Sequence, residues 1–435
     1  MPIGVSWGLW PRHEQQLIPM LSRFSELPDV PSMLPYGNGR SYGDVCLNGG
    51  GALLLTRGLD RFIRLDPASG IVECEGGVLL SEIIDLVLPH GWFPAVTPGT
   101  ALVTVGGAIA NDVHGKNHHR TGTFGHHVLD LELKRSDGRS LQCGPEHNPD
   151  WFCATVGGLG LTGLIRKARL QLRRVPGPWL RGDSQRFRNL EEFFALAAQS
   201  DRVFEYTVAW LDCAALGSKL GRGVFMRANH VAHAGGEPRS RMPRRVPLTP
   251  PISLINHFSV RLFNELYFHR PGAQLAQAVW HYRNYLYPLD GILQWNRIYG
   301  PNGFFQYQCV LPGSTEAQST SLREMLRRIA LSGLGSFLAV LKQFGDRPSL
   351  GMLSFPRVGV TLALDFPNNG ATTLRLLENL DAITREAGGA VYAAKDARMS
   401  AQSFQRYFPR WRQFSPYIDP RFSSSFWRRV SAGTA

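Results

Sequence analysis

The chain has 435 residues, of which 43% are hydrophobic and 19% charged, and this composition excludes a disordered or fibrous protein. Its length favours two or three domains. The 47 Lys and Arg residues exceed the 34 Asp and Glu residues, and the net charge of +13 favours polyanions, phosphorylated ligands or an anionic membrane surface as partners. Neither an apolar run of about 18 residues nor a secretory N-terminal pattern is present, so we expect a cytoplasmic protein.

The cysteine and histidine patterns indicate neither a metal site nor a disulfide framework. The six cysteines stand singly, without a C-x-x-C pair. They are Cys46, Cys74, Cys143, Cys153, Cys213 and Cys309. A group of histidines lacks the neighbouring thiols or carboxylates that a zinc site needs, so we expect no metal. These histidines are His114, His118, His119, His126 and His127.

The first 175 residues are rich in short β-type runs separated by glycine turns. Alternating apolar residues, the period of a half-buried strand, are clearest over residues 164–172. Apolar residues at helical spacing predict one helix over 79–90. The expected strands span 50–56, 61–65, 70–75, 127–134 and 164–172.

The pattern changes near Pro176, where we expect a domain boundary. Helical stretches alternate with strand-like runs in this second part. The expected helices span 189–198, 273–287 and 322–333, and the expected strands span 303–311 and 359–366. The basic stretch 217–251 is expected to be an exposed loop because it is rich in glycine, proline and arginine.

One glycine pattern resembles a dinucleotide-binding fingerprint, but the residues that follow it do not have the helical pattern that this fingerprint requires. Gly158, Gly160 and Gly163 have G-x-G-x-x-G spacing, and Asp183 follows about 20 residues later, as in a dinucleotide fingerprint. That fingerprint has to open a helix, whereas the residues after Gly163 alternate as a strand. We therefore expect no Rossmann domain.

Three glycine-dense segments lie within the β-rich region. They are 35–44 (PYGNGRSYGD), 97–119 (TPGTALVTVGGAIANDVHGKNHH) and 154–165 (ATVGGLGLTGLI). Glycine permits close backbone approach, and consecutive free N–H groups bind phosphate oxygens. A single segment of this kind is ordinarily a tight turn. Three in one region suit a long diphosphate cofactor that lies across several loops.

The order of five motifs resembles the decaprenylphosphoryl-β-D-ribose 2′-oxidase family of vanillyl-alcohol oxidase type flavoproteins. The motifs are GRSYGD, HGKNHH, ATVGGLGLTG, QWNRIYGPNGFFQYQ and AKDAR, and the similarity runs from about Leu34 to near the C-terminus. The resemblance implies an α+β fold with two domains. An FAD-binding domain would span 1–175, completed by 390–435, and a substrate domain over 176–389 would be built on an antiparallel sheet with helices.

The resemblance implies FAD as cofactor. Relatives that bind flavin covalently often have histidine where this chain has Arg40, and arginine cannot form that bond, so we expect non-covalent FAD. The cofactor-binding residues that the resemblance implies are Gly39, Arg40, Ser41, Tyr42, Gly43, Pro98, Gly99, Thr100, Thr104, Gly106, Gly107, Asn111, His114, Gly115, Gly158, Thr162, Ile165, Tyr392 and Lys395.

The resemblance also implies catalytic and substrate-binding residues. Lys395 matches the family lysine between flavin and substrate, where it stabilises charge on the flavin or relays the hydroxyl proton, and Tyr42 lies near the flavin. From the residues alone, Lys395 beside Asp396 would be a surface ion pair. The implied substrate-binding residues are Lys116, Trp210, Arg297, Gln306, Gln308, Lys342 and Phe344, with Trp295 in the same region.

Gln306 and Gln308 lie two residues apart in a strand-like run, so their side chains point to one face. They suit sugar hydroxyls, although a polar outer face on a strand is the simpler interpretation without the resemblance. Two positions depart from the family pattern: Ala363 stands where some relatives have cysteine, and Thr361 replaces an amide. Both differences bear on pocket shape.

By resemblance, the expected reaction is the FAD-dependent oxidation of the C2′ hydroxyl of a polyprenyl-phosphate-linked pentose, such as decaprenylphosphoryl-ribose, to the keto sugar. A separate nicotinamide-dependent short-chain reductase would reduce this product and complete an epimerisation to arabinose for cell-wall biosynthesis. The lipid tail would bring the chain to the inner membrane face, with residues 239–245 near anionic headgroups.

Three alternatives remain open. An FAD-dependent oxidase of a soluble sugar or aldonolactone would share the cofactor domain, because fold does not fix substrate. A non-catalytic scaffold could retain FAD. A nucleic-acid-binding protein would agree with the net charge, but it predicts steeply salt-dependent binding and no yellow cofactor. The resemblance favours the lipid-linked sugar, and we expect no nucleic-acid partner.

Overall fold

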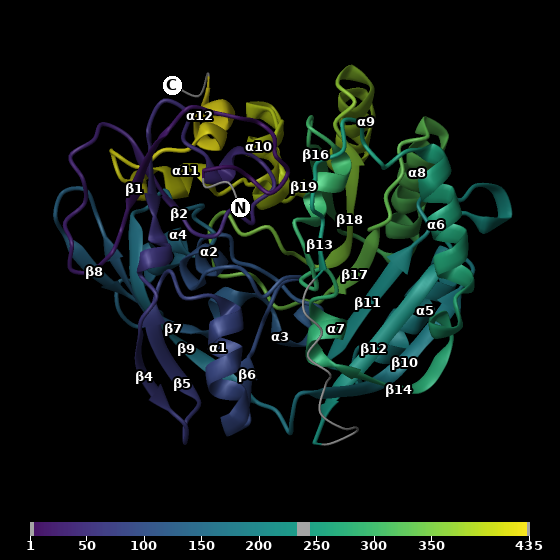
Figure 1. Cartoon of the computed structure of the whole chain (residues 1–435), viewed down its shortest axis with the longest axis horizontal. Helices are drawn as coiled ribbons and strands as arrows, with labels where there is room; N and C mark the ends of the chain where they lie inside the picture. Colours follow the sequence, from purple (N-terminus) through teal and green to yellow (C-terminus); the bar gives the residue numbers. More distant parts are fainter. Residues whose placement is uncertain (1–3, 233–243, 433–435) are drawn as a thin grey trace.

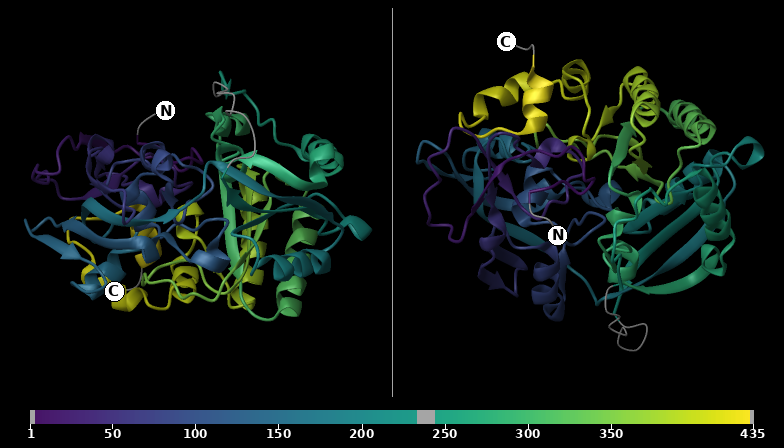
Figure 2. Two further views of the ribbon diagram at one scale, coloured as in Figure 1. Left: turned by 90° about the horizontal axis from the view of Figure 1, so that it is seen from below. Right: turned by 45° about the horizontal axis from the view of Figure 1, so that its top comes forward.

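The structure is a computed structural model that describes residues 4–232 and 244–432. Two large sheets lie side by side, each with helices beside it (Figure 1). The earlier residues, drawn in purple and blue, form one half, and the later residues, drawn in teal and green, form the other (Figures 1 and 2). Helices and antiparallel sheets are mixed, so the expected α+β class is confirmed.

The sheet of the first half has strand order β4-β5-β9-β7-β8, and β6 pairs with β9 outside this path. Its strands are β4 (Phe62–Asp66), β5 (Ile71–Glu75), β6 (Trp92–Pro94), β7 (Val128–Lys134), β8 (Ser140–Cys143) and β9 (Leu164–Arg174). On β9, Leu164, Ala168 and Leu170 are buried, as the alternation predicted. Because Gly163 leads into this strand and not into a helix, the glycine pattern at 158–163 is not a Rossmann fingerprint.

Helices of the first half connect these strands. They are α1 (Leu80–Val87), α2 (Val105–Ala110), α3 (His118–Thr121) and α4 (Pro149–Thr155). The predicted helix over 79–90 is α1 followed by a 3-10 turn over Leu88–His90. Helix α1 buries its apolar face, including Ile83 and Val87, in the same core as β5 and β9.

A small parallel sheet, in the order β1-β3-β2, joins the two ends of the chain. Its strands are β1 (Gln16–Pro19), β2 (Met33–Tyr36) and β3 (Ala52–Leu55). Met33 forms a β-bridge with Phe422, so the last residues of the chain return to its beginning. The helices of this return are α10 (Ala401–Tyr407), α11 (Trp411–Phe414) and α12 (Ser425–Ser431), drawn in yellow in Figure 1.

The sheet of the second half has strand order β14-β10-β12-β11-β17-β18-β16-β19, and the pairs between neighbours are antiparallel. Its strands are β10 (Trp179–Phe187), β11 (Tyr206–Leu211), β12 (Gly223–Val231), β14 (Leu275–His281), β16 (Phe304–Leu311), β17 (Val340–Phe344), β18 (Gly359–Pro367) and β19 (Ala390–Val391). A separate parallel pair joins β13 (Arg244–Arg245) to β15 (Ile292–Leu293).

The helices of the second half are α5 (Leu190–Ser200), α6 (His257–His269), α7 (Tyr282–Leu286), α8 (Thr315–Ser332) and α9 (Ala371–Glu386). Helices α5, α8 and α9 cover one face of this sheet, whereas α6 and α7 pack against part of the other face, which looks toward the first half. Phe305, Tyr307 and Cys309 of β16 pack in one core with α5, α8 and α9. The alternate residues Gln306 and Gln308 therefore face the other way, as predicted.

Two expectations about secondary structure are wrong. Residues 275–281, expected to be helical, form the edge strand β14, and only Tyr282–Leu286 is helix. Backbone pairing with β10 overrides the local helical preference of this segment. Residues 223–231 were expected to lie in a loop, but they form β12, which pairs on both sides with β10 and β11. Residues 239–243 of the proposed headgroup segment lie outside the described residues.

The predicted domain boundaries at 175 and 390 can be compared with the points where the chain passes from one sheet to the other. Sheet membership changes between β9, which ends at Arg174, and β10, which begins at Trp179. At the other end, β19 still pairs with β16 of the second sheet, although it lies at the predicted start of the returning segment. The boundaries at 175 and 390 therefore stay a prediction.

Candidate active site

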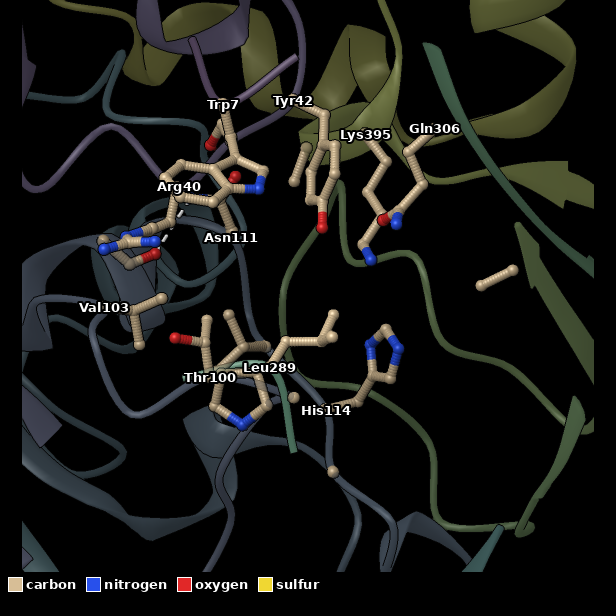
Figure 3. A pocket seen from close by; sticks show the side chains of 18 of the residues that line it. Trp7, Arg40, Tyr42, Thr100, Val103, Asn111, His114, Leu289, Gln306 and Lys395 are labelled. Carbon is tan, nitrogen blue, oxygen red and sulfur yellow. Dashed lines mark hydrogen bonds between the residues drawn. The ribbon is translucent and has the colours of Figure 1, made fainter. Parts of the chain in front are cut away.

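A cavity of about 630 Å³ lies where the glycine segments of the first half meet the face of the second sheet that looks toward them. Its volume is in the range of sites for small molecules and cofactors. Figure 3 shows Arg40, Trp7 and Thr100 on one side, and Tyr42, Lys395, Gln306 and His114 on the other. We call these two parts the glycine end and the lysine end of the cavity.

Most of the residues expected in the site line this cavity. They are Gly39, Arg40, Ser41, Tyr42, Pro98, Gly99, Thr100, Thr104, Gly106, Gly107, Asn111, His114, Gly115, Lys116, Ile165, Trp210, Trp295, Gln306, Gln308, Lys342, Tyr392 and Lys395. They come from positions up to 356 residues apart, from Gly39 to Lys395, and the fold therefore brings the separate motifs to one place. The two positions that depart from the family pattern differ in their relation to the cavity. Ala363 lines it, whereas the Thr361 hydroxyl accepts a hydrogen bond from the side chain of the lining residue Gln308.

Five expected residues do not line the cavity. They are Gly43, Gly158, Thr162, Arg297 and Phe344. The Arg297 guanidinium donates instead to the carbonyl of Pro247 at 2.8 Å. Phe344 packs edge-on against His114, with ring centres 4.8 Å apart, and so supports a lining residue. A Cβ on Gly43 would come within 1.7 Å of the Asp396 carbonyl oxygen, so Gly43 allows two backbone segments to touch.

The glycine end has the features of a diphosphate cradle. The Thr104 side chain caps α2 by accepting from the Gly107 N–H at 3.1 Å. A Cβ built on Gly99 would meet no atom within 4 Å, so open space lies directly above the backbone there. The Arg40 guanidinium lies 4.2 Å over the Trp7 ring, and its buried Nε has no partner among the described residues. These open and unpartnered groups fit an extended dinucleotide such as FAD.

The lysine end is built around Lys395 and Tyr42. Lys395 ends the 3-10 turn η8 (Ala393–Lys395), and the Tyr42 N–H donates to the Ala394 carbonyl at 2.9 Å, which fixes the two segments together. The Lys395 ammonium lies 4.9 Å from the centre of the Tyr42 ring. Burial lowers the pKa of Lys395 from its ordinary value, while the charge of Asp365 opposes this shift. The neutral amine is therefore accessible, which a surface ion pair would not allow.

Two further lysines face the same cavity. Lys116 donates to the carbonyls of Tyr285 and Leu286, the latter at 3.3 Å. Burial lowers its pKa to about 7. Burial, together with the charges of Lys395 and Lys116, also lowers the pKa of Lys342 to about 7. An anionic ligand would favour the charged form of both lysines, so this end suits a phosphate.

His114 is held in its neutral form. Its Nε2 accepts from the Gln308 side-chain amide at 2.9 Å, and the same amide donates to the Thr361 hydroxyl at 3.1 Å. Burial holds the pKa of His114 well below its ordinary value. The buried Nδ1, which then carries the proton, has no partner among the described residues. His114 therefore presents a donor that is free for a bound group.

Sequence reasoning missed several lining residues. Trp7, Tyr285, Leu289 and Asp290 reach the cavity from segments without a glycine motif. The half-buried Asp290 carboxylate accepts from the Ala101 N–H at 2.8 Å and so holds the middle glycine segment in place. Nothing local in the sequence marks these residues, because tertiary packing alone brings them to the site.

Within residues 4–232 and 244–432, no group of three His, Cys, Asp or Glu side chains is arranged to hold a metal ion. No helix there is long and apolar enough to cross a bilayer.

Comparison with known proteins agrees with this geometry. A family model described as "FAD binding domain" matches residues 9–144, which contain the first two glycine segments. The fold and the site thus define an FAD-dependent oxidoreductase, with FAD as cofactor. The chain is 35% identical over 416 residues to the decaprenylphosphoryl-β-D-ribose oxidase of Mycolicibacterium smegmatis, a match that covers 91% of this chain and 88% of that enzyme. It belongs to this oxidase family.

Two other relatives differ in how much they cover. An uncharacterized protein of Streptomyces coelicolor is 32% identical over 374 residues, which is 81% of this chain and 100% of that protein. Cytokinin dehydrogenase 9 of Oryza sativa subsp. japonica is 31% identical over 147 residues, 33% of this chain and 28% of that enzyme. The partial match to the dehydrogenase carries no argument about substrate.

Proposed function

We propose that the protein oxidises the C2′ hydroxyl of a polyprenyl-phosphate-linked pentose, such as decaprenylphosphoryl-ribose, to the keto sugar. This would be the first half of an epimerisation to arabinose in cell-wall biosynthesis. Family membership supports the substrate, and the observation that carries the chemistry is the buried, easily deprotonated Lys395 beside Tyr42. Lys116 and Lys342, at the same end of the cavity, would bind the phosphate.

The residues of the chain divide the work between binding and proton transfer. The glycine end would hold the FAD diphosphate, and Arg40 and Asn111 would meet its polar groups. Bound FAD supplies a hydride acceptor. In its neutral form, Lys395 would take the hydroxyl proton at Nζ as the C–H bond breaks. Aromatic walls such as Trp210 and Tyr392 would exclude water from this step.

An anaerobic absorbance titration with a polyprenyl-phosphoribose tests the reaction. We expect the visible flavin absorbance of the wild type to bleach as substrate is added. Lys395→Arg keeps the charge but cannot lose its proton, and we expect it to slow bleaching by at least about 100-fold, as Lys395→Met should. Lys219→Arg, at an exposed lysine outside the cavity, should change nothing.

Other outcomes would redirect the proposal. Fast bleaching of Lys395→Arg would show that the charge matters and that the base lies elsewhere. A wild type that is bleached by a soluble sugar or an aldonolactone, but not by the lipid-linked pentose, would favour the soluble-substrate oxidase. The keto product would require a nicotinamide-dependent short-chain reductase as partner, which a coupled assay of the two enzymes can test.

We further propose that the chain binds the surface of an anionic membrane through α6. Phe258, Leu262 and Leu266 form one stripe on this helix at spacing i, i+4, i+8, and their exposed fractions are 75%, 51% and 64%. The opposite side of α6 carries Tyr267, whose ring packs 4.5 Å from that of Trp210 in the cavity wall. The exposed Arg261 lies on the same helix and suits anionic headgroups.

Flotation with vesicles tests this membrane contact. We expect binding to phosphatidylglycerol vesicles, weaker binding to phosphatidylcholine vesicles, and loss of binding in the double variant Leu262→Asn, Leu266→Asn. Leu331→Asn is the control, because Leu331 is a 60% exposed leucine on α8. Equal flotation of both variants would refute the contact through α6. Loss of reductase binding instead of vesicle binding would make the stripe a protein-docking surface.

A further inference from the structure

A buried carboxylate behind the cavity wall controls the orientation of one lining residue. Gln306 and Asp365 lie opposite each other in the β16–β18 pair. The Gln306 side-chain amide donates to Asp365 Oδ1 at 2.6 Å. Asp365 is fully buried and does not line the cavity, whereas Gln306 does. Asp365 therefore acts on the site only through its neighbours.

Two more hydrogen bonds hold Asp365 in place, one to its carboxylate and one to its backbone. The Tyr299 hydroxyl donates to Oδ2 at 3.4 Å, and the Asp365 N–H donates to the Ser336 hydroxyl at 3.2 Å. The pairing of β18 with β16 includes Asp365 itself, opposite Gln306, so its backbone is fixed within the sheet. The carboxylate position is thus set by the fold before any ligand binds.

An ionised carboxylate only accepts hydrogen bonds, so the amide of Gln306 has one allowed orientation. Its NH₂ group faces Asp365, and its Oε1 faces away. This Oε1 is buried and has no partner among the described residues. Figure 3 shows the side chain of Gln306 beside that of Lys395, with both ends pointing into the cavity. The cavity wall next to the proposed base therefore presents an acceptor and not a donor.

We propose that Asp365 is a positioning residue that makes Gln306 a fixed acceptor for a second sugar hydroxyl, adjacent to the one that is oxidised. The reacting hydroxyl gives its proton to Lys395, so it has no proton left for Gln306, and the acceptor must serve a neighbouring hydroxyl. The site would then select a substrate with two vicinal free hydroxyls. This inference rests on the proposed function, and it identifies the hydroxyl next to the oxidised one as the group that the cavity recognises.

The test compares a pentose substrate with its analogue in which fluorine replaces the vicinal hydroxyl. Fluorine cannot donate, so we expect the wild type to lose about tenfold or more in kcat/KM with the analogue. In Asp365→Asn the partner can donate as well as accept, and the Gln306 amide is free to turn. The ratio between the two substrates should then fall to about two, mainly through a change in KM.

Tyr299→Phe is the matched control, because it removes one contact to Asp365 and leaves the bond to Gln306. Its substrate ratio should equal that of the wild type. Equilibrium binding of both sugars to the anaerobic, reduced holoenzyme, which cannot oxidise them, is followed by tryptophan fluorescence. The ratio of the two dissociation constants should fall in Asp365→Asn in the same way as the ratio of kcat/KM. If Asp365→Asn slows both substrates equally and keeps the ratio, the proposal is overturned.

The test still gives an answer if the Asp365→Asn variant does not fold or if the lipid-linked pentose does not react. If Asp365→Asn does not fold, Gln306→Met decides, since a substrate ratio that survives loss of the amide would place the acceptor elsewhere. If the lipid-linked pentose fails to reduce the wild-type flavin, the proposed function fails. The same ratio is then measured with a soluble pentose that does reduce it, so failure of the substrate and failure of the inference are distinguishable.

Discussion

Arg429 of α12 forms a two-point ion pair with Asp44, at 2.6 and 3.0 Å, across 385 residues of sequence. The same guanidinium reaches Asp396 at 3.1 Å. Asp44 follows the loop that carries Tyr42, and Asp396 follows Lys395. One arginine near the C-terminus therefore ties together the two segments that form the lysine end of the cavity.

Replacement of this arginine should be costly. Arg429→Met leaves two buried carboxylates without their cation, and we expect the free energy of unfolding to fall by about 3 kcal/mol. Flavin reduction should also slow, because the Tyr42 and Lys395 segments loosen. Urea denaturation and the bleaching assay measure the two effects. Arg412→Met, at an exposed arginine on α11, is the control, and equal losses in both variants would contradict this role.

Gly99 offers a test of the cofactor cradle that spares the fold. A side chain there would enter open space within the cavity, so Gly99→Val should fold normally and bind little FAD. Gly291→Val is the control, because a Cβ at Gly291 also meets nothing within 4 Å and lies outside the cavity lining. The ratio of flavin to protein absorbance after purification measures the outcome. Full flavin content in Gly99→Val would place FAD elsewhere.

The flavin should be dissociable. Arg40 occupies the position from which covalent relatives attach the cofactor, and its guanidinium stacks on Trp7 without a nucleophile for the flavin. Acid precipitation should therefore release FAD into the supernatant, identified by its fluorescence and chromatographic mobility. Yellow colour that stays with the washed pellet would show a covalent bond to some other residue.

Lys342 should make stability depend on pH. Burial and two neighbouring lysines lower its pKa to about 7 in the folded protein, whereas the unfolded side chain keeps its proton to about pH 10.4. Unfolding takes up a proton within this window, so the destabilisation is complete below pH 7 and disappears as the pH rises toward 10.

Lys342→Met should therefore raise the melting temperature of the holoenzyme at about pH 6, by roughly 2–4 °C, and by less at about pH 9. Thermal unfolding followed by flavin fluorescence measures both values. Lys219→Met, at an exposed lysine, should have little effect at either pH. A gain for Lys342→Met that is the same at both pH values would contradict this assignment.

The sequence predicts those parts of the site that depend on local backbone chemistry. Glycine loops near Gly99 and Gly106 were recognisable because phosphate cradles need glycine at specific places, and both line the cavity. Strand alternation placed Gln306 and Gln308 on one face without knowledge of the fold. Lys395 is predicted only through its motif, since a lysine next to Asp396 in the sequence is typical of an ordinary surface ion pair.

Other features depend on distant packing and have no local signature. Asp365 looks like an ordinary strand residue, and only its cross-strand partner Gln306 gives it a role. Arg297 lies in a family motif, but its side chain turns to the carbonyl of Pro247, and the motif does not specify that direction. The local pattern of residues 275–281 predicts a helix, whereas the strand β14 forms by pairing with β10, whose residues lie about a hundred positions earlier.

The segment from Ala390 to Lys395 belongs to both halves of the molecule at once. It begins as strand β19 on β16, the Tyr392 N–H donates to the Gln308 carbonyl at 2.9 Å, and two residues later the Ala394 carbonyl accepts from Tyr42. A chimera that exchanges the second sheet between relatives therefore has no neutral breakpoint on either side of Lys395. The exchanged block would have to include this segment and also the loop that carries Tyr42. The second sheet and this loop of the first half can therefore be exchanged only together.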